Sequence, residues 1–268
     1  MRAARLGALR VVEDEDLAWL TEALYGAIIG LALGLTGGGG SIITLPILVY
    51  LVGETVHDAI GTSLAVVGGI ALQGIVGQRA RVDWKTGVTL GGLGLLGSVP
   101  ASVLAQRVPD RVLLLLFAAV MLVAAVAMLR MKRVADEAER RPPRLAVALV
   151  GISLGFLTGF LGVGGGFLIV PTLMLALRFS MQRAIPTSLL VITLNSIASL
   201  AARTAVSGIE WHLVALFLAG GLVGNYVGAA GAQALDQRRL KQIFAVFVIA
   251  VGLFTGGSAM GIIPVRVH

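Results

Sequence analysis

Two glycine clusters are the residues of this sequence best suited to binding chemistry. The first reads TGGGGS over residues 36–41, and the second reads GVGGGF over residues 162–167. Glycine lets backbone amides approach a ligand closely, and a helix N-terminus offers unpaired N–H groups and roughly half a positive charge. Because a short apolar stretch follows each cluster, two such helix starts would attract an anion if they met. The alternative is that these glycines serve close helix packing.

Hydroxyl side chains recur at matching places in the two halves of the chain. Thr62 and Ser63 lie in the sequence AIGTSL, and Thr187 and Ser188 lie in the sequence AIPTSL. Their hydroxyl groups could donate hydrogen bonds to an oxyanion. They could equally cap a helix start or bond to a carbonyl within the helix.

Two amide side chains lie deeper in the same two segments. An unpaired amide is costly there, so Gln73 and Asn195 either line a pathway or bridge neighbouring helices. The residues that we expect to bind substrate are Gly37, Gly38, Gly39, Gly40, Ser41, Thr62, Ser63, Gly162, Gly164, Gly165, Gly166, Thr187, Ser188 and Asn195.

The elements that must position these residues are membrane helices. Hydrophobic residues make up 57% of the chain and charged residues 13%, whereas soluble domains carry about 25% charged residues. Residues 60–78 and 112–129 contain no charge, and about 20 apolar residues span a bilayer core. The composition therefore predicts an all-α polytopic protein surrounded by the lipid bilayer.

The charged residues indicate topology rather than a charged partner. The net charge is +7, with 21 Lys and Arg against 14 Asp and Glu, and nearly all of it lies in short connectors. This pattern orients membrane spans, so we expect no nucleic acid partner. The chain has no cysteine, and its three histidines are scattered. We therefore expect no metal site and no cofactor.

The chain is an internal duplication. Residues 30–46 superpose without gaps on residues 155–171 at an offset of 125, and the same offset places residues 59–64 on residues 184–189. With two extra residues, 82–84 fall on 209–211. This predicts a polar N-terminal tail (1–16), a first membrane repeat (17–129), a charged cytoplasmic connector (130–144), a second repeat (145–260) and a C-terminal tail (261–268).

Each half contains five apolar segments, and the second one is too short to span. The ten segments are 17–35, 41–52, 59–78, 86–106, 112–129, 145–161, 167–177, 184–202, 212–235 and 242–257. We expect the first two of each half to form a glycine-led re-entrant, V-shaped helical hairpin, which leaves three spanning helices. An odd number of crossings makes the repeats inverted. Inverted and parallel repeats place the basic residues on one side equally well when Arg2, Arg5 and Arg10 are counted, and inversion does so better when these three are left out.

Other polar and small residues have structural interpretations. Small residues at four-residue spacing, such as Gly94 and Ser98 or Gly220 and Gly224, predict a smooth ridge for helix contact. The pairs at 83–84 and 210–211 each place an acid at a helix N-terminus and a tryptophan anchor at the membrane interface. Acids and histidines such as Glu22, Glu54, His57, Asp58 and His212 lie near segment ends, so no proton relay is expected within the spans.

These motifs resemble the TauE/SafE family of sulfite exporter-like permeases. The resemblance rests on GLALGLTGGGGSIITLP, GFLTGFLGVGGGFLIVP, AIGTSL and AIPTSL, and it covers nearly all of the chain after about residue 20. It implies an inner-membrane permease that exports sulfite, sulfoacetate or another sulfur-containing anion. One departure from symmetry is Gly61, where the second half has Pro186.

Together these features predict a permease, not an enzyme, that moves a small anionic substrate by alternating access between two repeats. One alternative is an intramembrane enzyme acting on a lipid, although acidic and metal-binding residues are sparse. Others are an importer or exporter of a different small oxyanion, and a membrane scaffold. The sequence leaves the oligomeric state open and allows a homodimer.

Overall fold

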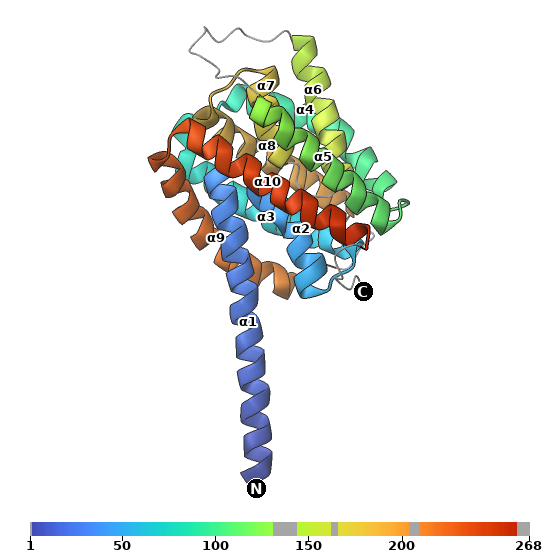
Figure 1. The fold of residues 1–268 in the computed structure, drawn as a ribbon, viewed down its shortest axis with the longest axis vertical. Helices are drawn as coiled ribbons and strands as arrows, with labels where there is room; N and C mark the ends of the chain where they lie inside the picture. The colour runs from blue at the N-terminus through green and yellow to red at the C-terminus, as the bar shows by residue number, and fades with distance from the viewer. Residues whose placement is uncertain (1, 131–143, 162–165, 204–208, 262–268) are drawn as a thin grey trace.

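The computed structural model describes residues 2–130, 144–161, 166–203 and 209–261, and these residues are helical apart from short turns and loops (Figure 1). Gly162, Gly164 and Gly165 lie outside the described residues, as do most of the predicted connector and C-terminal tail. The elements are α1 (Arg2–Thr36), α2 (Gly39–Pro46), the π-helix η1 (Ile47–Val52), α3 (Val56–Gln78), η2 (Arg79–Arg81), α4 (Trp84–Ala105), α5 (Asp110–Arg130), α6 (Arg144–Leu161), α7 (Gly166–Ala176), α8 (Met181–Arg203), α9 (Trp211–Ala234) and α10 (Gln237–Ala259).

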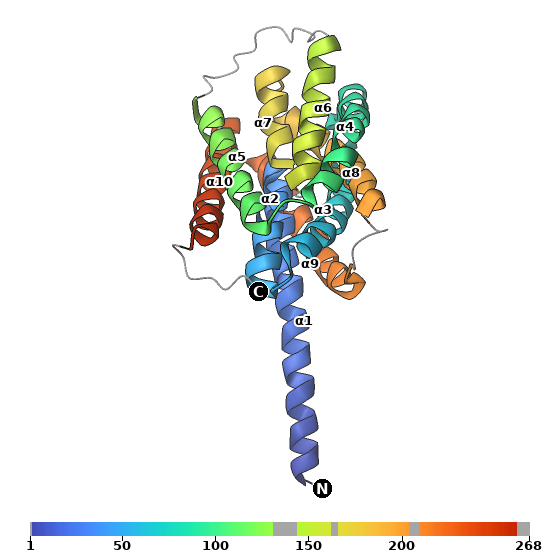
Figure 2. The ribbon, with the colours of Figure 1, turned by 90° about the vertical axis from the view of Figure 1, so that its right-hand side faces the viewer.

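The helix boundaries follow the apolar segments closely. In each half the second helix begins at the glycine cluster and is short: α2 continues into η1 and ends at Val52, and α7 has 11 residues. The predicted N-terminal tail is helical from Arg2 and continuous with the first apolar segment in α1. The start of α1 projects alone beyond the other helices (Figures 1 and 2).

Among the described residues, seven helices are long and apolar enough to cross a membrane. They are α3, α4, α5, α8, α9 and α10, together with the part of α1 from Trp19 to Thr36. The stretch Gly39–Val52 is apolar but shorter, and so is Val147–Leu161 in α6. The chain is therefore a multi-pass membrane protein.

The first helix of each half packs against the other half of the chain. The first α-helix of each half packs along the fourth α-helix of the other, in the pairs α1 with α9 and α6 with α4. Equivalent helices of the two halves also contact each other, in the pairs α2 with α7, α3 with α8 and α5 with α10. In both views α1 rises from the lower end while α6 descends from the upper end, so the two helices run in opposite directions (Figures 1 and 2).

Glycines bring the backbones of α1 and α9, and those of α6 and α4, into contact. A Cβ added to Gly30 of α1 would lie 1.9 Å from the Gly221 carbonyl oxygen, and one on Gly155 of α6 would lie 1.9 Å from the Gly94 carbonyl oxygen. A Cβ on Gly220 would lie 1.8 Å from the Ala23 carbonyl oxygen. These separations leave no room for a side chain, which confirms the predicted packing role of the small-residue ridges.

Candidate functional site

The first glycine cluster breaks the helix and reverses the chain. Gly37 has a φ of +68°, a conformation that glycine adopts without strain. The hydroxyl of Thr36 accepts the N–H of Gly39 at 2.6 Å, so it satisfies one of the free backbone amides at the start of α2. A Cβ on Gly40 would lie 2.4 Å from the Ile29 carbonyl oxygen, which shows that α2 folds back against α1.

The starts of α2 and α7 lie together inside the protein. A Cβ added to Gly166, the first residue of α7, would lie 3.0 Å from the Cα of Gly38 and 3.1 Å from the Oγ of Ser41. All the residues of α2 are buried, and the hydroxyl of Ser41 donates to the Gly38 carbonyl oxygen at 2.7 Å. The start of α2 and the first described residues of α7 therefore lie against each other.

Ser188 links the second half to the break in the first. Its hydroxyl lies 2.7 Å from the Gly37 carbonyl oxygen and 2.7 Å from the Ile185 carbonyl oxygen, and these two acceptors share its single hydrogen. The equivalent serine, Ser63, is fully buried, and its hydroxyl has no hydrogen-bond partner among the described residues. The offset would place Ser63 opposite Gly162, which lies outside those residues.

Replacing Ser188 with alanine should lower the free energy of unfolding by about 1–3 kcal/mol, because the buried Gly37 carbonyl loses its donor. Ser196→Ala is the matched control on α8, since the Ser196 hydroxyl is buried without a partner in the described part of the chain. That variant should be as stable as the native protein or more so. Thermal unfolding in detergent measures both. Equal losses in the two variants would contradict the bracing role of Ser188.

Thr62 and Thr187 have different partners, although they occupy equivalent positions. The hydroxyl of Thr62 donates to Oε1 of Glu54 at 3.0 Å. The hydroxyl oxygen of Thr187 instead accepts the backbone N–H of Asp83 at 3.0 Å. Each threonine therefore ties its own helix to a loop, and only Thr62 is bonded to an ionisable side chain.

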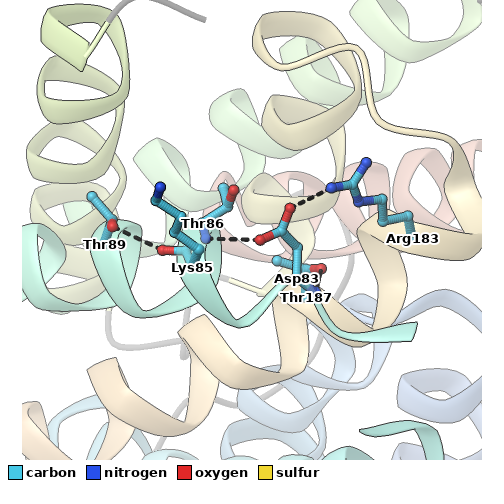
Figure 3. A network of polar contacts seen from close by, with 6 residues as sticks. All are labelled: Asp83, Lys85, Thr86, Thr89, Arg183 and Thr187. Atoms are coloured by element: carbon cyan, nitrogen blue, oxygen red, sulfur yellow. Dashed lines mark hydrogen bonds and ion pairs between the residues drawn. The ribbon is translucent and has the colours of Figure 1, made fainter. Parts of the chain in front are cut away.

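A cavity of about 640 Å³ opens beside Thr187. Its lining includes Arg81, Asp83, Ser180, Arg183 and Gln233. Figure 3 shows the polar network at its wall, in which the Arg183 guanidinium pairs with the Asp83 carboxylate.

Asp83 is the centre of this network. Its carboxylate accepts the N–H of Thr86 at 2.9 Å, which confirms the predicted acid at the start of α4 (Figure 3). Burial alone would raise the pKa of Asp83, but the hydrogen bonds from Thr86 and Arg183 outweigh burial and lower this pKa. The guanidinium also lies 4.4 Å from the ring centre of Phe179. The cavity therefore has both a fixed carboxylate and a positive group at its wall.

The two deeper amides have different roles. Gln73 bridges helices, because the side-chain amide of Asn225 on α9 donates to its Oε1. Asn195 is fully buried, and neither its Oδ1 nor its Nδ2 has a partner among the described residues. Its counterpart in the first half, at the offset of 125, is the apolar Ile70. The position itself therefore does not require an amide.

Sequence reasoning did not identify Glu54, Arg183 or Asn225 as parts of this arrangement. Glu54 was interpreted only as a residue near the end of an apolar segment, although it precedes Thr62 by only eight residues. The pair of Asp83 and Arg183 joins residues 100 positions apart, so no local pattern reveals it. Asn225 falls in a glycine-rich helix, and its own amide could have marked it as a bridging candidate.

Comparison with known proteins places the chain among membrane transporters. The family model described as "Sulfite exporter TauE/SafE" matches residues 23–255. A "Probable membrane transporter protein" of Xylella fastidiosa (strain 9a5c) is 34% identical over 238 residues, which cover 85% of this chain and 91% of that protein.

More distant relatives carry the same description. "Probable membrane transporter protein YdhB" of Bacillus subtilis is 26% identical over 84% of this chain and 95% of its own length. "Probable membrane transporter protein MJ0441" of Methanocaldococcus jannaschii is 30% identical over 66% of this chain and 69% of its own length. No solved structure matches the chain.

Proposed function

This chain belongs to the Sulfite exporter TauE/SafE family and is a membrane transporter, and on that premise we propose that it exports a small sulfur-containing anion. Sulfite and organosulfonates such as sulfoacetate are the substrates of this proposal. The observation that carries it is the contact between the two glycine-led helix starts, with Gly166 of α7 against Gly38 and Ser41. Two helix N-termini at one buried place favour a negative guest.

The substrate-binding residues of this proposal are the glycines of the two clusters with Ser41, Thr62, Ser63, Thr187, Ser188 and Asn195. One of them supports it most directly. Asn195 is fully buried, and its side-chain polar atoms have no partner within the described ranges. Buried polar groups without partners are costly, so in a transporter such a group is suited to binding a polar substrate.

We further propose that the halves are inverted repeats that alternate access to this site. The opposite directions of α1 and α6 support inversion (Figures 1 and 2). So does the matching packing of α1 against the second half and of α6 against the first half. In this arrangement α1 with α2, and α6 with α7, are the hairpins whose short helices enter the membrane without crossing it.

The cavity beside Thr187 is, in this proposal, the cytoplasmic mouth of the pathway. Arg81, Lys85 and Arg183 lie at this end of the molecule, and Arg81 and Arg183 line the cavity. Basic residues favour the cytoplasmic side and attract an anion before it enters.

Purified protein in detergent should be stabilised against thermal unfolding by sulfite or sulfoacetate, because a ligand that binds only the native state raises stability. Thiosulfate and sulfate test other anions of sulfur, and choline serves as the cationic control. The same anions should exchange across proteoliposomes that contain the protein. If no sulfur-containing anion stabilised the protein and none exchanged across the proteoliposomes, the proposed substrate class would be refuted.

A further inference from the structure

Glu54 occupies an unusual position for a carboxylate. It lies in the loop between η1 and α3, directly after Gly53, whose φ is +88°. Its Oε1 accepts the hydroxyl of Thr62 at 3.0 Å. Its Oε2 is buried and has no hydrogen-bond partner in the part of the chain that the structure describes. An ionised carboxylate with a buried, unbonded oxygen is unfavourable, whereas a protonated one is not.

The surroundings of Glu54 also favour its neutral form. Burial raises the pKa of Glu54 to about 7; the hydrogen bond from Thr62 opposes this, and the charges of Glu210 and Asp58 add to it. Other ionisable groups also lie on the elements at this end. His57 pairs with Asp110 at 2.8 Å, and Arg111 donates to the Ala259 carbonyl oxygen. The rings of Tyr50 and His212 contact Phe254 and Trp19, and Arg107, three residues before Asp110, is exposed. The side chain of Arg203 lies outside the described residues.

The end of the molecule at Thr187 has a different charge pattern. By the sequence offsets, Arg183 stands where the first half has Asp58, and Asp83 stands where the second half has Glu210. At the Thr187 end an arginine balances the acid. At the Thr62 end the equivalent positions add a second and third acid beside Glu54. An anion that passes Thr62 therefore meets repulsion unless a carboxylate is neutralised.

We propose that Glu54 is a protonation site of the pathway, and that a substrate anion passes Thr62 only when Glu54 carries a proton. This inference rests on the proposed function, because it assigns a control to the same route.

The hydrogen bond to Thr62 supplies a physical mechanism. When Glu54 is ionised, its carboxylate can only accept, so the Thr62 hydroxyl must point its hydrogen at Glu54. When a proton from water binds the carboxylate, the acid itself becomes a donor. The Thr62 hydroxyl can then accept from Glu54 and turn its own hydrogen toward the anion. Protonation thus removes a negative charge and adds a donor at the same place.

The test is anion exchange in proteoliposomes at equal pH on both sides and zero membrane potential. Sulfoacetate is the appropriate probe, because its sulfonate and carboxylate stay ionised from about pH 6 to pH 8, whereas sulfite itself titrates there. Exchange by the native protein should fall roughly tenfold over this range, following the protonated fraction of a group with a pKa of about 7.

The Glu54→Gln variant should exchange the anion over the whole pH range at the rate that the native protein shows at low pH, since glutamine stays neutral. Glu22→Gln is the matched control, an acid on α1 that should keep the native pH profile. A native rate independent of pH, or a native pH profile in Glu54→Gln, would overturn the inference and leave the proposed function standing. Native protein that exchanges no sulfur-containing anion at any pH would overturn both.

A measurement without substrate tests the protonation itself. The pKa of Glu54 is raised from 4.5 in the unfolded chain to about 7 in the folded protein. The folded protein therefore binds the proton more tightly, and stability is lost as the pH rises between these two values. Glu54→Gln should lack this loss, so its thermal stability relative to the native protein should grow over that interval. An equal pH dependence in both proteins would contradict the assignment.

Discussion

Replacing Gly97 with leucine should abolish the folded protein, whereas the same replacement five residues earlier, at Gly92, should be tolerated. A Cβ on Gly97 of α4 would lie 2.2 Å from the Ile152 carbonyl oxygen and 2.7 Å from the Phe156 backbone nitrogen of α6. Both are backbone atoms of the neighbouring helix and cannot rotate away. The helices must separate, at a cost that we expect to exceed about 3 kcal/mol.

Gly92 provides the control on the same helix. It is exposed on the surface of α4, and nothing lies within 4 Å of a Cβ added there. Leucine at position 92 should also improve the helix propensity. The amount of monodisperse protein after detergent extraction and the unfolding temperature measure both variants. If the Gly97→Leu variant had normal yield and stability, the packing of α4 against α6 would not depend on contact between their backbones.

Replacing Asn195 with isoleucine should stabilise the protein and impair transport. The side-chain amide of Asn195 is fully buried without a partner in the described residues. Removing such a group should add about 1–3 kcal/mol to the free energy of unfolding. The shape should be tolerated, because Ile70 fills the equivalent place: it lies against Gly221, as Asn195 lies against Gly94.

The effect on transport should be opposite in sign. If the amide binds the substrate anion, its loss removes a hydrogen bond to a charged group and should lower anion exchange by about tenfold or more. Thr193→Val is the control on α8, because the Thr193 hydroxyl already donates to the Leu189 carbonyl oxygen. That variant should exchange anions like the native protein. A stable Asn195→Ile variant with native exchange would remove Asn195 from the proposed site.

Opposite effects on stability and transport would distinguish a binding residue from a structural one. A packing residue loses stability and activity together when it is replaced. A residue that is kept for a ligand is costly to the empty protein, so its replacement relieves that cost. Ser188 is a residue of the proposed site that also braces the Gly37 carbonyl oxygen, so its replacement should lower stability and exchange together.

The local sequence was sufficient to predict the helices and their interruptions. Long runs without charge predict spans because the bilayer excludes charged groups. The glycine cluster at residues 36–41 predicts a break because glycine adopts a positive φ at little cost, and Gly37 has a φ of +68°. Small residues at four-residue spacing, such as Gly220 and Gly224, predict a contact ridge because this spacing places them on one face of a helix.

The tertiary structure decided which residues meet. Only packing shows that α1 pairs with α9 of the other half and that Asn225 reaches Gln73, because apolar helices carry little information about their partners. Packing likewise gives Asp83 an arginine while Glu54 receives a threonine and two neighbouring acids. The sequence by itself determined where the chain can cross and break, since those properties depend on neighbours along the chain. The raised pKa of Glu54 and the buried amide of Asn195, which has no partner among the described residues, depend on burial and on distant residues, which only the folded chain brings together.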